Sequence, residues 1–76
     1  MLPLDQLRPG QRGEIISLDA DAAASQRLME MGLLEGALIE LIGFAPLGDP
    51  LEIRVGDYRL SLRRSEAAHV RVQLTH

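Results

Sequence analysis

The chain has 76 residues, of which 46% are hydrophobic, and a net charge of −3. A chain this short holds one packed core, so we expect a single domain over residues 1–76. The sequence contains no cysteine, which excludes disulfides and thiolate-ligated zinc, and its acidic balance argues against general nucleic-acid binding.

Neither secretion nor membrane insertion is predicted. Pro3 and Asp5 lie where a signal peptide would have an uninterrupted apolar run. The most apolar stretch, residues 37–46, contains Glu40 and is far shorter than the roughly 20 residues that a membrane-spanning helix needs. We therefore expect a cytoplasmic protein.

The start of the chain predicts a lead-in, a turn and a strand. Residues 2–7 carry three leucines and precede Arg8-Pro9-Gly10. That tripeptide is a turn signal, because proline fixes one backbone dihedral and glycine permits the next. Residues 14–18 are rich in β-branched and apolar side chains, which favours the first strand.

A helix is predicted over residues 22–31. Asp19 or Asp21 caps its start by accepting a backbone N–H. Gly32 ends it, because glycine adopts the left-handed conformation there and lets Leu33 fold back onto the helix. Three apolar residues spaced four and three positions apart share one face: Ala24, Leu28 and Met31.

Residues 37–44 predict the second strand, with both faces partly covered. Residues 46–50 then form an exposed loop, since they include two prolines and a glycine. Alternation assigns one face of the strand to Leu38, Ile42 and Phe44 and the other to Ile39 and Leu41.

Residues 51–62 predict a β-hairpin, because two runs of alternating apolar residues flank the two-residue turn Gly56-Asp57. Pairing across this turn sets every apolar residue on the same inward face, Tyr58 included. The predicted pairs are Val55 with Tyr58, Ile53 with Leu60 and Leu51 with Leu62.

The end of the chain predicts a helical turn and a closing strand. Ser65 is placed to cap a turn over residues 66–68. Apolar residues then alternate with polar ones from Val70 to Leu74. Together the elements predict a mainly β fold: a small five-stranded barrel with one α-helix between the first two strands and a short helical turn before the last strand.

Three segments resemble the FeoA family and span nearly the whole chain in the family's order. The first is residues 27–36, in which Arg27 and Leu28 precede the glycine stop and Gly36 opens the next strand. The second is Gly48-Asp49-Pro50, followed by Ile53, Val55 and Gly56. The third is Leu60-Ser61-Leu62-Arg63 with Glu66-Ala67 and Val70-Arg71-Val72.

This resemblance implies that residues 1–76 form one FeoA-type, SH3-like domain. It also implies a partner, the large membrane transporter of ferrous iron FeoB, which carries a cytosolic GTP-hydrolysing domain. The function expected from the family is that of a small accessory protein of bacterial ferrous iron uptake. Docking on the transporter, stabilising it and modulating it all fit, and would bring the protein to the inner membrane through its partner. No particular oligomeric state is predicted.

A second interpretation stays open at this point. The same SH3-like module occurs in metal-dependent transcriptional regulators, and small barrels bind single-stranded nucleic acids by stacking bases on exposed aromatic side chains. Phe44 and Tyr58 are the only Phe, Tyr or Trp residues in the chain. The sequence has no DNA-reading segment, which favours the accessory role and no nucleic-acid partner.

Catalysis is not predicted. The sequence shows no nucleophile with a base, no paired carboxylates and no cluster of metal ligands, so we expect neither an enzyme nor a bound cofactor or metal. His69 and His76 are expected at the surface. Asp19 and Asp21 are more simply interpreted as helix caps than as metal ligands.

Two segments are candidates for partner binding, and the first is the end of the predicted helix. Met29, Leu33 and Leu34 there would form an adaptable apolar turn that suits a partner's groove. The alternative is that Met29 is buried under the N-terminal leucines.

The second segment is a basic edge made of Arg54, Arg59 and Arg63. The hairpin register sets Arg54 directly opposite Arg59, a like-charge pair that costs stability, with Glu52 on the diagonal to relieve part of it. A solvated surface is the alternative. We hypothesise that the edge and the apolar turn form one partner face that contacts an acidic protein surface.

Overall fold

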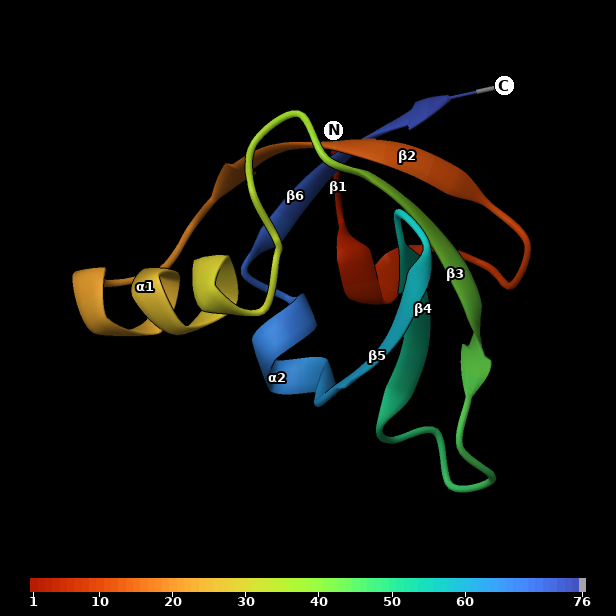
Figure 1. Cartoon of the computed structure of the whole chain (residues 1–76). Helices are drawn as coiled ribbons and strands as arrows, with labels where there is room; N and C mark the ends of the chain where they lie inside the picture. The colour runs from red at the N-terminus through yellow and green to blue at the C-terminus, as the bar shows by residue number, and fades with distance from the viewer. Residues whose placement is uncertain (76) are drawn as a thin grey trace.

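The protein is described by a computed structural model over residues 1–75. Within these residues the chain is mainly β, with six strands, two α-helices and one 3₁₀ helix (Figure 1). The strands are β1 (Leu2–Pro3), β2 (Arg12–Leu18), β3 (Leu38–Phe44), β4 (Leu51–Val55), β5 (Tyr58–Leu62) and β6 (Val70–Thr75). The helices are η1 (Leu4–Gln6), α1 (Ala22–Glu30) and α2 (Arg64–Ala67).

All six strands form one antiparallel sheet in the order β1-β6-β2-β3-β4-β5. The expectation of five strands missed β1, where Leu2 pairs with Val72 and Pro3 with Arg71. Among residues 1–75, β1 and β5 end the sheet, so backbone pairing does not close the barrel completely. Figure 1 shows the sheet curving around η1.

The N-terminal lead-in contributes to the core. Leu4 of η1 is fully buried, and Leu7 is 2% exposed. Their side chains fill the interior of the curved sheet. Strand β1 has only two residues and could not fill this interior by itself. The largest fully buried side chains come from η1, the strands β2 to β6 and the loop after α1: Leu4, Ile15, Leu33, Leu41, Leu51, Ile53, Leu62, Val70 and Val72.

The β4–β5 hairpin has the predicted register in all three apolar pairs. Gly56 has φ +60°, which a two-residue turn with glycine at its first position requires. Tyr58 lies on the same face of the hairpin as Val55, as the register predicts, but it is 44% exposed at the end of its strand and is not part of the buried interior. Leu60 is half-buried.

A bulge in β3 corrects the predicted position of Phe44. The β3–β4 register shifts between Leu41 and Gly43, so that Phe44 pairs with the buried Leu51. One extra residue in a strand reverses the alternation beyond it. Phe44 therefore packs against the core, while Leu38 faces outward and is 65% exposed.

Helix α1 begins where the sequence predicts and ends at Glu30, one residue before the predicted end, with Met31 as its C-cap. Asp21 caps it, since its Oδ1 accepts from the N–H of Ala24 at 2.8 Å. Gly32 has φ +96° and lets the N–H of Leu33 donate to the carbonyl of Leu28 at 3.1 Å. Among residues 1–75 no helix is long and apolar enough to cross a bilayer.

The cap of α2 differs from the prediction. Its N-cap is Arg63, not Ser65, because the backbone of Arg63 is still extended, with φ −70° and ψ 148°. The Glu66 carboxylate accepts from the N–H of Arg63 at 3.1 Å. A glutamate three residues after the cap thus replaces the expected serine hydroxyl.

Candidate partner-binding surface

The C-terminal end of α1 is tied to the β4–β5 hairpin. The hydroxyl of Tyr58 donates to the main-chain oxygen of Met31 at 2.6 Å. A Cβ on Gly32 would collide with that hydroxyl, so glycine is needed for the close approach as well as for its positive φ. This contact fixes the position of the helix end beside the hairpin turn.

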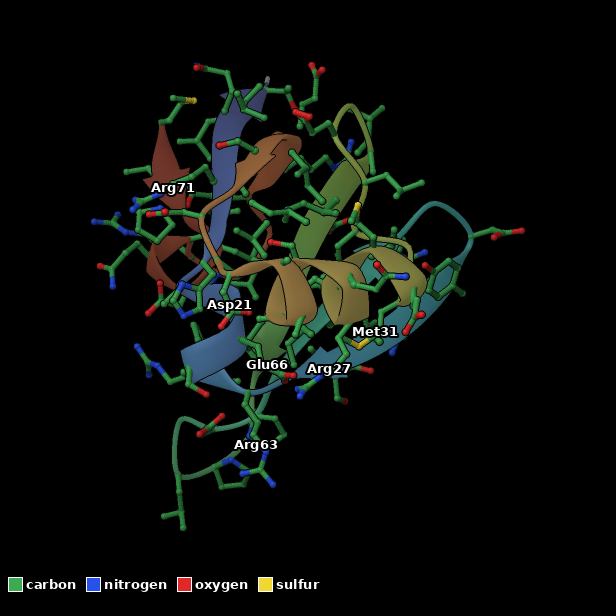
Figure 2. The ribbon with its side chains drawn as sticks, turned by 90° about the vertical axis from the view of Figure 1, so that its left-hand side faces the viewer. Asp21, Arg27, Met31, Arg63, Glu66 and Arg71 are labelled. Carbon is green, nitrogen blue, oxygen red and sulfur yellow. The ribbon has the colours of Figure 1, made fainter. Side chains whose placement is uncertain are left out.

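A second contact holds α1 against α2. Arg27 Nη2 lies 3.0 Å from Glu66 Oε2, and Figure 2 shows the two side chains pointing toward one another. The arginine is well exposed, so the ion pair adds at most about 1 kcal/mol. Together the two contacts hold α1 at two points, because Tyr58 begins β5 and Glu66 lies in α2, which follows the other end of that strand.

Four exposed apolar side chains lie around the hairpin turn, on the end of α1, on the loop that follows it and on the adjoining strands. We call them the apolar rim: Met29 (43% exposed), Leu34 (51%), Leu38 (65%) and Tyr58 (44%). The alternative of Met29 buried under the N-terminal leucines is wrong, because Leu4 and Leu7 face the core and Met29 faces solvent.

Leu33 does not belong to this exposed surface, contrary to the prediction. It is fully buried and is part of the core cluster. The bond from its N–H to the carbonyl of Leu28 turns the chain back over the helix end and sends the side chain inward. Leu34, the next residue, remains outside.

Leu38 is a rim residue that sequence reasoning did not select. It directly precedes Ile39, which pairs with Val55, so it lies beside the hairpin turn at Gly56. The signal was the alternation of β3, which separates Leu38 from the buried Ile39. The same alternation also placed Leu38 on one face with Phe44, which packs against the core, and Leu38 was therefore not identified as exposed.

Charged side chains form a row across the outward face of the sheet. Cross-strand neighbours in this row are Arg12 and Glu40, then Glu40 and Arg54, then Arg54 and Arg59. The predicted opposition of Arg54 and Arg59 is confirmed. Glu52 lies on the diagonal as expected, with Oε2 at 3.8 Å from Arg59 Nη1.

Arg63 stands apart from the other two arginines of the predicted basic edge. It is exposed at the end of β5, where its backbone caps α2. Four residues of extended chain separate it from Arg59, which is roughly 13 Å along the strand. Arg54 and Arg59 therefore form a close pair, and Arg63 does not join them.

The basic edge and the helix end lie on different faces of the hairpin. Side chains alternate along a strand, so Arg54 and Arg59 project opposite to Val55 and Tyr58. The structure does not bring the two predicted segments onto one flat surface. They approach each other only around the turn at Gly56, beside Leu38.

The remaining polar candidates are engaged in structural contacts. Asp19 does not cap α1; its Oδ2 lies 2.9 Å from Arg71 Nη2. His69 is exposed, and its Nδ1 lies 2.7 Å from the main-chain oxygen of Asp19. His76 falls outside the described residues. Over residues 1–75 no group of three or more His, Asp or Glu side chains could hold a metal ion.

The chain is similar to known proteins over nearly its whole length. A family model described as the FeoA domain matches residues 2–74. A curated relative, the Fe(2+) transport protein A/Fe(2+) transporter FeoB fusion protein of Porphyromonas gingivalis, is 37% identical over 71 residues. The match covers 93% of this chain, and the chain spans only 8% of that relative's length.

Solved structures of similar proteins have the same fold. The FeoA protein from Chlorobium tepidum is 39% identical with a TM-score of 0.90, over 99% of this chain and 71% of the other. FeoA from Stenotrophomonas maltophilia, complexed with zinc and described as a prokaryotic SH3 domain protein, is 32% identical. Its TM-score is 0.81, over 96% of this chain and 91% of the other. The predicted SH3-like fold is confirmed.

Proposed function

Because the chain belongs to the FeoA family, we propose that it is an accessory protein of bacterial ferrous iron uptake that binds an FeoB-type transporter and supports or modulates its activity. The role is one of binding and not of catalysis. Contact with the transporter would place the protein on the cytoplasmic side of the membrane.

The observation that carries this proposal is the fusion protein. A segment 37% identical to nearly the whole of this chain is joined there to FeoB in one polypeptide. Covalent joining raises the effective concentration of one module at the other, which is useful when the two act together. Where the modules are separate chains, a surface contact has to replace the linker.

The exposed surface supports a protein partner. The apolar rim offers methionine, leucine and tyrosine side chains, which suit a recognition surface. Arg54 and Arg59 beside it carry positive charge on a protein whose net charge is −3. Such local charge steers an acidic partner and favours one orientation.

The aromatic residues favour this function over nucleic-acid binding. Tyr58 is bonded to Met31 and packs over Gly32. The guanidinium of Arg64 lies 5.2 Å from the centre of the Phe44 ring. The Tyr58 ring is therefore held in place by its hydroxyl, and the Phe44 ring has one face covered, which disfavours the base stacking that dominates single-strand recognition by small barrels.

Calorimetric titration of the chain with the purified cytosolic portion of an FeoB-type transporter tests the proposal. We expect saturable binding that depends on the guanine nucleotide present. A parallel titration with single-stranded oligonucleotides at low salt is expected to show none. Tight oligonucleotide binding without transporter binding would reverse the assignment in favour of a regulatory module.

A further inference from the structure

A groove of about 530 Å³ opens beside the hairpin turn, on the outward face of the sheet. Its size is in the range that accommodates a few side chains of a bound segment. Strands β2, β3, β4 and β6 contribute to it, and the side chains that matter most are Arg12, Leu38, Glu40 and Arg54.

The charges in and around the groove are unevenly paired. Arg12 Nε lies 3.7 Å from Glu40 Oε1, and Arg59 is paired with Glu52. Arg54 has no ion pair within residues 1–75, although it lies next to Glu40 on one side and Arg59 on the other. Two arginines directly opposite each other on one face destabilise the sheet. A carboxylate placed between Arg54 and Arg59 would relieve this repulsion.

Leu38 gives the groove an apolar contact point. It is 65% exposed, whereas its neighbour Ile39 is 3% exposed. Leu38 pairs with Glu14 of β2, and the next residue, Ile39, is paired with strands on both sides, so Leu38 projects from the sheet and not from a loop. A partner's apolar side chain can therefore pack on it without ordering any of this chain, which reduces the entropic cost of binding.

The charge of the groove argues against a second copy of the chain as its occupant. Two copies packed face to face about a twofold axis at the Arg54–Arg59 pair would bring these arginines against the same pair of the other protomer. Repulsion between these arginines disfavours a second copy as the occupant of the groove. An acidic segment has the complementary charge.

We propose that an acidic segment of the transporter's cytosolic portion binds in this groove and extends over its β5 edge. A carboxylate of the segment would lie between Arg54, which lines the groove, and Arg59, which lies beside it, and a neighbouring apolar side chain would pack on Leu38. The proposal rests on the function proposed above and adds the chemistry of the partner segment. A partner segment bound in the groove can continue around the turn at Gly56 and contact the apolar rim. One partner can therefore bind both the basic edge and the apolar rim although they lie on different faces.

The test compares two variants with matched controls in titrations against the purified cytosolic portion. Leu38→Ser is expected to weaken binding about tenfold, whereas Leu47→Ser, which changes a leucine 97% exposed on the β3–β4 loop, leaves it unchanged. Arg54→Gln is expected to weaken binding about three- to fivefold at low salt and to reduce the salt dependence. Arg8→Gln, which removes an exposed arginine outside the groove, has no such effect.

The outcomes separate this inference from the proposed function. If the wild-type chain binds and Leu38→Ser and Arg54→Gln bind as tightly as their controls, the groove is not the site, and the proposed function stands. If the wild-type chain does not bind the cytosolic portion at all, both are wrong. Thermal unfolding of each variant confirms that a loss of binding is not a loss of fold.

Discussion

The hydroxyl of Tyr58 is bonded to the main-chain oxygen of Met31, 27 residues earlier, and so joins the β4–β5 hairpin to the end of α1. This bond holds the apolar rim together, because Met29 and Leu34 are on one side of it and the hairpin turn is on the other. The rim therefore depends on a tertiary contact and not on the helix alone.

Tyr58→Phe removes this bond and leaves the carbonyl of Met31 without its partner. We expect the free energy of unfolding to fall by about 1 kcal/mol. Urea denaturation of the wild-type and variant proteins measures the difference. An unchanged midpoint would show that water satisfies the carbonyl equally well.

Gly32→Ala is expected to destabilise the protein by about 1–3 kcal/mol, because alanine is strained at φ +96° and its Cβ meets the Tyr58 hydroxyl. Part of this cost should vanish in a Tyr58→Ala background, where the collision is gone. A double-mutant cycle by denaturation measures the coupling. Strict additivity would mean that backbone strain accounts for the whole effect.

Leu33→Ala and Leu34→Ala should differ sharply although the residues are adjacent. Leu33 is fully buried, so its truncation leaves a cavity and costs about 2–4 kcal/mol. Leu34 is 51% exposed, so its truncation should change stability by less than about 0.5 kcal/mol. Equal losses would contradict the assignment of Leu34 to the rim.

Arg54→Glu should separate stability from binding. Glutamate at this position would attract Arg59 on one side and repel Glu40 on the other, so the two changes offset each other and stability is expected to change by less than about 0.5 kcal/mol. Binding to an acidic partner should fall. Denaturation and capture of the transporter's cytosolic portion measure the two effects.

In cells, the double substitution Arg54→Glu with Arg59→Glu should reduce iron uptake. Unchanged capture of the transporter and unchanged iron uptake would show that the basic edge takes no part in partner binding.

The hairpin shows what the sequence could predict and what it could not. Its register follows from Gly56-Asp57 and the alternation around it, and it is observed pair for pair. The exposure of Tyr58 was missed, because alternation gives the direction of a side chain but not how far the neighbouring elements extend over it. Tyr58 lies at the end of β5 next to the turn, where the neighbouring elements cover only part of its side chain.

The other differences also arise from tertiary contacts or from local backbone geometry. The bulge between Leu41 and Gly43 reverses the face of Phe44, and Gly43, a glycine inside a strand, is the residue type that could have indicated it. From the sequence, Leu33 is expected both to fold back onto the helix at Gly32 and to lie on the exposed turn, and its burial agrees with the first expectation alone. Pairing of Leu2 with Val72 joins the two ends of the chain, and local pattern cannot reveal such a contact.

Capture of the full-length FeoB-type transporter from detergent-solubilised membranes tests the central claim most directly. Tagged wild-type chain and the Leu47→Ser control should retain the transporter, and the Leu38→Ser, Arg54→Gln double variant should not. If the folded wild-type chain does not retain the transporter, the account is contradicted.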